Sequence, residues 1–191
     1  MSSAGYEHGN AEVGRLLAGA AKTIARVRYC WLVTAAGSGG ANARPMGRLL
    51  HDPDEDEWKI RFVTDGRSRK ASDIGRSGKV TIIFQDDPDD AFVTLTGSAA
   101  LRRDASEVRR RWKRGYDAYF PSEEDRANAI FVEIDVERME LWIRGVTPEP
   151  FGLRTTVLAR EGRGPWQLMA GGSNPNFPQI CAQLVDVVLV V

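Results

Sequence analysis

The chain has 191 residues and a mass of 21.1 kDa, and 42% of its residues are hydrophobic, so it is large enough for one domain with a substantial core. Its 26 basic and 26 acidic residues give a net charge of zero, which argues against a dedicated nucleic-acid-binding protein, because such proteins usually carry a basic excess. The two cysteines exclude a disulfide framework and a multi-cysteine zinc site, and they indicate reduced thiols in a cytoplasmic protein.

The N-terminal part of the sequence predicts a helix followed by strands. Residues 1–10 are polar, lack the features of a signal peptide and are expected to be loose. Apolar residues then recur at three- and four-residue spacing over 11–27, which predicts an amphipathic helix. Short β-branched or alternating runs, separated by a glycine-rich turn and an acidic turn, predict three strands over 29–35, 43–50 and 58–64.

The middle of the sequence combines short helices with further strands. Ser68 is the predicted N-cap of a helix over 68–75, and Asp104 is the predicted N-cap of a helix over 104–116. Alternating apolar runs predict four strands over 79–84, 91–98, 129–136 and 139–143.

The C-terminal part predicts a final hairpin and then a tail. The hairpin strands are expected over 153–160 and 166–169, which gives a domain over 11–170. The tail, 171–191, has uncertain structure and no apolar run long enough to cross a membrane. Because strands dominate and short turns join them, we expect a mainly β protein, an antiparallel barrel or sandwich with helices at its ends.

The segment 64–70, TDGRSRK, ends a predicted strand and begins a predicted helix. It combines two hydroxyl groups with three cationic side chains, those of Arg67, Arg69 and Lys70, and with the free amide groups of a helix N-terminus. These groups are typical of a phosphate-binding site, to which Ser68 would add its hydroxyl. A capped surface helix with ordinary basic residues is the alternative interpretation.

Two other segments allow a functional and a structural interpretation. In the predicted strand 43–50, Pro45 marks an edge or a bulge, and Arg44 beside it would either face a ligand or protect the edge. The arginine-rich segment 102–114 is interpreted as a solvated helix face rather than a nucleic-acid-binding surface. The sequence has no HExxH, paired-cysteine or GxSxG motif that would indicate a metal site or a nucleophilic hydrolase.

The order of several short motifs resembles a known family. The motifs YCWLVT, ARPM, W-x-I-x-F-V-T-D, SRKASDI, KVTIIF, FVTLTGSA and a late ELW follow one another within residues 11–144. In this order they resemble the pyridoxamine 5′-phosphate oxidase-like split β-barrel superfamily, and within it the general stress protein branch of FMN-binding proteins. The resemblance implies an antiparallel split β-barrel of six to eight strands with N-terminal and peripheral helices, and a homodimer with FMN at the subunit interface.

The resemblance also implies a cofactor site. In the family, the strand with the Arg-Pro-Met motif lines the flavin, and the F-x-T strand end touches the flavin and the ribityl chain. The S-R-K turn binds the FMN phosphate, and a late tryptophan contacts the flavin of the other subunit. The matching residues here are Arg44, Pro45, Met46, Val63, Thr64, Ser68, Arg69, Lys70 and Trp142.

The function implied by the resemblance is FMN-dependent electron transfer to or from a small molecule, with NAD(P)H or oxygen as the other reactant. The sequence lacks the Arg-x-His motif that true oxidases carry in the region after Trp142, and Leu49 or Leu50 stands where they carry a lysine. Pyridoxamine phosphate is therefore not the expected substrate. Two alternatives stay open: a protein that stores or senses flavin without turnover, and a split barrel that binds a deazaflavin or haem.

Overall fold

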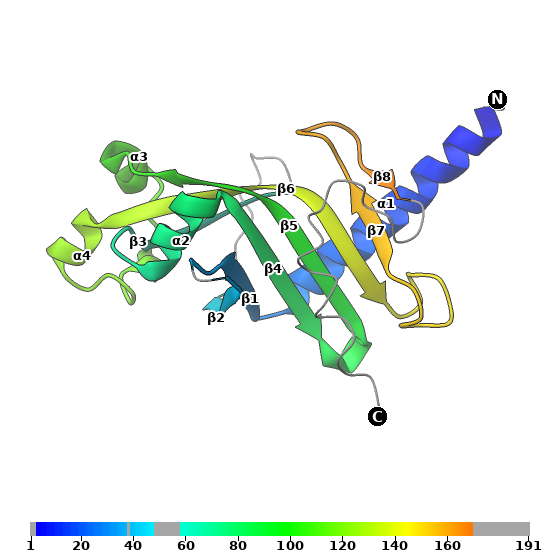
Figure 1. Ribbon diagram of the computed structural model, residues 1–191, viewed down its shortest axis with the longest axis horizontal. Helices are drawn as coiled ribbons and strands as arrows, with labels where there is room; N and C mark the ends of the chain where they lie inside the picture. The colour runs from blue at the N-terminus through cyan, green and yellow to red at the C-terminus, as the bar shows by residue number, and fades with distance from the viewer. Residues whose placement is uncertain (1–2, 38, 48–57, 170–191) are drawn as a thin grey trace.

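Eight antiparallel strands form one sheet in the computed structural model, which describes residues 3–37, 39–47 and 58–169 (Figure 1). The strand order is β2-β1-β4-β5-β6-β7-β8, and β3 pairs with β6 off this path. No pairing joins β2 to β3 within the described residues, so the sheet is open there, and the expected antiparallel split-barrel fold is confirmed. The strands are β1 (Tyr29–Ala35), β2 (Ala41–Gly47), β3 (Lys59–Asp65), β4 (Lys79–Asp86), β5 (Ala91–Arg102), β6 (Ala129–Ile143), β7 (Thr156–Ala159) and β8 (Gln167–Leu168).

Helix α1 (Ser3–Arg26) packs on the core side of the sheet and extends beyond it at its N-terminus (Figure 1). Leu16 and Ala20 are fully buried against the strands. The helix includes most of the stretch that was expected to be loose, because apolar spacing identifies only the turns that pack against the sheet. The other helices are α2 (Arg69–Ser77), α3 (Ala105–Arg110) and α4 (Glu123–Ala127), with the 3-10 helices η1 (Asp87–Asp89) and η2 (Arg114–Tyr116). Among the described residues, no helix is long and apolar enough to cross a membrane.

The central strands bury alternate residues, as the period of a β-strand requires. One face of β1, β4, β5 and β6 forms the core together with α1 and α2. The opposite face, called the outer face below, carries large apolar side chains that are half-buried or exposed. They form two rows across the sheet, because Trp31 pairs with Ile83 and Phe92 pairs with Trp142.

Strand β6 is continuous, although the sequence predicts two strands in this region. Thr96 pairs with Arg138 and Gly97 pairs with Val136, so Glu137 has no direct partner on β5 and forms a β-bulge. The prediction of a break is wrong because a bulge interrupts the apolar alternation of a strand without ending the strand.

A small apolar cluster lies where α3 and the following segment cross β6. Trp112 makes edge-to-face contacts with Tyr116 and Phe120, with ring centroids 5.5 Å apart in both pairs. This packing turns the chain, so α3 ends at Arg110 and the predicted helix over 104–116 is too long. The buried members of the cluster are Val108, Phe120, Ala129 and Phe131.

Glu133 on β6 is a buried carboxylate on the side of the strand opposite the core, and only 6% of its surface is exposed. Arg102 donates from Nε to the carboxylate at 2.7 Å, Arg61 also donates to it, and Lys59 Nζ lies 3.6 Å away. Burial alone would raise the pKa of Glu133, but the hydrogen bonds and charges of these basic groups outweigh it and lower the pKa from 4.5 to about 2.

Replacing Glu133 by glutamine should lower the free energy of unfolding by about 1–2 kcal/mol at neutral pH, allowing for solvent screening of the ion pairs. Because the folded-state pKa is depressed, the carboxylate's contribution is fully present above pH 4.5 and is lost as the pH falls toward about 2. The difference between wild type and Glu133→Gln should therefore shrink below pH 4.5. Urea denaturation of both proteins between about pH 7 and pH 3 measures this difference in the free energy of unfolding. A difference that stays constant over this pH range would contradict the lowered pKa of Glu133.

Candidate cofactor-binding site

The N-terminus of α2 is built by a short turn at the end of β3. Ser68 has an extended backbone and is the N-cap, as predicted, since its Oγ accepts a hydrogen bond from the amide of Ala71 at 3.3 Å. Its own amide donates to the carbonyl of Asp65 at 3.0 Å, and Thr64 Oγ1 lies 3.5 Å from Ser68 Oγ. The first amides of an α-helix have no partner within the helix and carry partial positive charge. The turn therefore places two hydroxyls beside a potential anion-binding helix end.

Lys70 on α2 faces strand β2. Its Nζ lies 3.8 Å from Met46 Sδ, a weak acceptor, and among the described residues it has no carboxylate partner. Burial and the nearby positive charge of Arg44 lower the pKa of Lys70. Lys70 and Arg44 thus form a partly buried pair of like charges, which an anion between or beside them would stabilise.

Asp73, also on α2, fixes the position of Arg44. Asp73 is 3% exposed, and its Oδ2 accepts hydrogen bonds from Thr34 Oγ1 at 3.1 Å and Asn42 Nδ2 at 2.9 Å. Arg44 Nη2 lies 3.4 Å from the same oxygen and donates to Thr34 Oγ1 at 2.9 Å. The hydrogen bond from Asn42 is the main reason why the pKa of Asp73 is lowered. Arg44 keeps its second terminal nitrogen, Nη1, buried without a hydrogen-bond partner.

Asp73 and its partners are not among the site residues predicted from the sequence. The sequence offers only a weak signal, a carboxylate directly before the buried Ile74 in a short helix. Its partners Thr34 and Asn42 are 39 and 31 residues away in the chain, on β1 and β2, so only the fold brings them together.

The structure separates the cations of the TDGRSRK segment. Arg67 pairs with Asp65 at 2.8 Å and with Glu124 at 3.1 Å, so its guanidinium group is already neutralised by carboxylates. Arg69 is exposed and, among the described residues, has no ion-pair partner. Only Arg69 and Lys70 of the three predicted cations are therefore available to an anion at this helix end.

The other predicted site residues lie on different surfaces. Val63 is on the face of β3 opposite Thr64, and its side chain packs against the apolar cluster around Phe131, which leaves only its backbone on the site side. Pro45 is exposed opposite Trp31 at the sheet edge. Trp142 is half-buried on the outer face of β6, and three strands separate β6 from β2, so one chain does not bring it to the Arg44–Lys70 pair.

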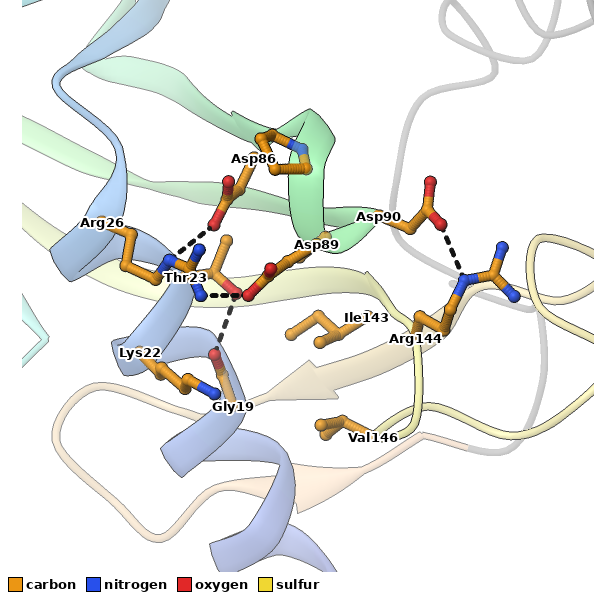
Figure 2. A pocket seen from close by; sticks show the side chains of 12 residues that line it. Gly19, Lys22, Thr23, Arg26, Asp86, Asp89, Asp90, Ile143, Arg144 and Val146 are labelled. Atoms are coloured by element: carbon orange, nitrogen blue, oxygen red, sulfur yellow. Dashed lines mark hydrogen bonds and ion pairs between the residues drawn. The ribbon is translucent and has the colours of Figure 1, made fainter.

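A pocket of about 250 Å³ lies elsewhere, between α1, the β4–β5 turn and the end of β6 (Figure 2). Arg26 pairs with Asp86 at 3.1 Å and also with Asp89, and Arg144 pairs with Asp90 at 2.7 Å (Figure 2). These ion pairs balance the charges inside the pocket and tie α1 and β6 to the turn, which indicates a structural role.

Comparisons with known proteins agree with this fold. General stress protein 26 from Bacillus anthracis str. Sterne is 18% identical with a TM-score of 0.54, covering 66% of this chain and 93% of that one. A Clostridium acetobutylicum protein related to general stress protein 26 is 20% identical with a TM-score of 0.57, covering 70% and 90%. A pyridoxamine 5′-phosphate oxidase-related, FMN binding protein from Nostoc punctiforme is 16% identical with a TM-score of 0.55, covering 91% and 100%.

At these identities the solved structures establish a shared fold and nothing more. No curated protein sequence matched the chain. The sequence model of a family described as "Pyridoxamine 5′-phosphate oxidase like" matches residues 18–149, which include β1 to β6 and the whole Arg44–Lys70 site. The chain therefore belongs to the pyridoxamine 5′-phosphate oxidase-like family.

Proposed function

We propose that the protein binds FMN and uses it to transfer electrons to or from a small molecule. The observation that carries this proposal is the arrangement at the start of α2, where the Ser68 N-cap and Lys70 lie next to Arg44 on β2. The Nostoc punctiforme protein of the same fold is described as FMN binding, which supports the choice of flavin.

The described residues fit a phosphate ester. Ser68, Arg69 and Lys70 would hold the phosphate through a hydroxyl, two cationic groups and the helix amides. Arg44 Nη1 is a buried donor without a partner, and an oxygen of the cofactor would satisfy it. When bound, FMN would supply the redox chemistry, while the protein supplies binding and orientation.

Asp73 would act as a positioning residue for this site. Its carboxylate holds Arg44 through Nη2, which leaves Nη1 directed to other acceptors. Thr64 is 2% exposed and adds a buried hydroxyl at the end of β3. Met46 on β2 lies beside the side chain of Lys70. Binding of an anion would offset the repulsion between Arg44 and Lys70.

We infer that two copies pair through the outer face. Trp31 is 48% exposed, and Ile83, Phe92 and Trp142 on the same face are only half-buried in one chain. Contiguous apolar surface of this kind is typical of a protein interface. In such a homodimer, Trp142 of the partner subunit would approach the flavin, which would explain why one chain does not bring Trp142 to its own site.

An absorption spectrum of the purified protein tests the cofactor. We expect flavin bands, about one FMN per chain on release by denaturation, and a sedimenting species of twice the 21.1 kDa chain mass. Anaerobic addition of NADPH or NADH followed by oxygen then tests turnover: bleaching and recovery support an oxidoreductase, whereas stable oxidised flavin favours storage or sensing. A colourless protein that takes up no added FMN would contradict the proposal.

A further inference from the structure

A second pocket, of about 690 Å³, is lined in part by Gly66 and Arg67 of the Asp65–Ser68 turn. Its walls come from three places in the sequence: the turn after β3, the end of β5 with α3, and α4 with the start of β6. It does not include Ser68, Arg69, Lys70 or Arg44 among its lining residues. Its volume is within the range of about 300–1,000 Å³ that is usual for small-molecule sites.

The residues that line the pocket carry more positive than negative charge, although carboxylates pair with two of the arginines. Four arginines line it against two carboxylates. Arg67 pairs with Asp65 and Arg126 lies 3.9 Å from Asp117, but Arg103 and Arg109 have no ion-pair partner among the described residues.

Arg103 is held close to the turn. Its Nη1 lies 3.1 Å from the position that a Cβ atom on Gly66 would occupy, and Ile130 Cγ2 lies 3.2 Å from the same position. The guanidinium group therefore lies directly over the turn at Gly66. Arg103 is exposed to solvent, and its guanidinium group lies at the wall of the pocket.

Apolar side chains also line the pocket. Val108 and Ile130 are each 4% exposed and line the pocket. Trp112 also lines it, and its indole is fixed because Nε1 donates to Asp117 Oδ1 at 2.9 Å while the ring packs edge-on against Tyr116. A preformed aromatic wall beside unpaired arginines is suited to a flat ligand that carries negative charge.

We propose that this pocket binds a small aromatic anion, a ring that carries a phosphate or carboxylate group. The anionic group interacts with Arg103 and Arg109, and the ring contacts Val108 and Trp112. The site is distinct from the proposed FMN site and shares only the Asp65–Ser68 turn as a common wall, so its ligand binds next to the flavin phosphate and not in place of it.

Calorimetric titration with adenosine 5′-monophosphate and, separately, with 1-naphthoate tests the proposal. We expect at least one of the two probes to bind, and adenosine and inorganic phosphate to bind at least about tenfold more weakly than the nucleotide. The double variant Arg103→Ala/Arg109→Ala should weaken probe binding by at least about tenfold. The matched control Arg110→Ala/Arg114→Ala removes the same charge from two arginines that are also exposed but do not line the pocket, and it should change binding by less than about twofold.

Two double variants distinguish ligand binding in this pocket from FMN binding at the Arg44–Lys70 site. Arg103→Ala/Arg109→Ala should keep its FMN and its melting temperature, whereas an Arg69→Ala/Lys70→Ala variant should lose FMN and still bind the probe. Three results would overturn the proposal: no binding of either aromatic anion, equal losses in the two arginine double variants, or phosphate binding as tightly as the nucleotide. Loss of FMN in Arg103→Ala/Arg109→Ala would show that the two sites are one.

Discussion

Replacing Arg69 and Lys70 together by alanine should abolish retention of FMN, with the dissociation constant raised by at least about 100-fold. Hydrogen bonds to charged groups contribute about 1.5–3 kcal/mol each, so the loss of two such interactions predicts a change of this size. Lys70 has the larger expected effect, because it is half-buried and its charge is poorly screened beside Arg44. Titration of the apoprotein with FMN, followed by quenching of flavin fluorescence, measures the constant.

The control for this variant is Arg67→Ala. Arg67 lies in the same turn and carries the same charge, but Asp65 and Glu124 already neutralise it. FMN affinity should therefore change by less than about twofold in Arg67→Ala. Unchanged affinity in Arg69→Ala/Lys70→Ala, or an equal loss in Arg67→Ala, would refute the assignment of the phosphate site.

The stability of the apoprotein gives an independent readout. The pKa of Lys70 is lowered by burial and by Arg44, which means that its charged form is disfavoured in the folded protein without a ligand. Removing Lys70 should therefore leave the melting temperature of the apoprotein unchanged or raise it. If FMN affinity falls while the melting temperature does not, Lys70 serves ligand binding. A merely structural role would lower both the FMN affinity and the melting temperature.

The alternation of apolar and polar residues predicts strands such as β1, because it arises from the burial of one face of a strand. The run 29–35 matches β1 at both ends, since its alternation is that of a strand with one buried face. Caps were equally predictable: Asp104 accepts hydrogen bonds from the amides of Ser106 and Glu107, as its position before α3 suggests. These features depend only on residues within one or two turns of each other.

Features that depend on tertiary contacts were not predictable. The helix predicted to reach Tyr116 stops early, because Trp112 packs against Tyr116 and Tyr116 in turn packs against Phe131 on β6. For the candidate site, the phosphate turn around Ser68 could be predicted from local chemistry. The link from Asp73 to Arg44 could not, because it requires β1, β2 and α2 to meet. The predicted tail over 171–191 lies outside the described residues.

The largest effect on stability is expected at Gly97, where β5 meets the bulge of β6. A Cβ atom there would lie 2.2 Å from the carbonyl oxygen of Asp135 and 3.0 Å from the Cα of Val136. Both are backbone atoms of a paired strand, so they cannot move aside without opening the β5–β6 pairing in the middle of the sheet. Gly97→Ala should lower the free energy of unfolding by about 3 kcal/mol or more.

Gly14→Ala is the matched control, because it makes the same chemical change where space is free. Gly14 is exposed in the interior of α1, and a Cβ there would meet nothing within 4 Å. Alanine should raise the free energy of unfolding by about 0.5–1 kcal/mol, since it loses less backbone entropy than glycine in a helix. Urea denaturation of the two variants should therefore move the midpoint in opposite directions. A small loss in Gly97→Ala, comparable to an ordinary surface substitution, would mean that the bulge adjusts and that β5 and β6 do not approach as closely as the structure shows.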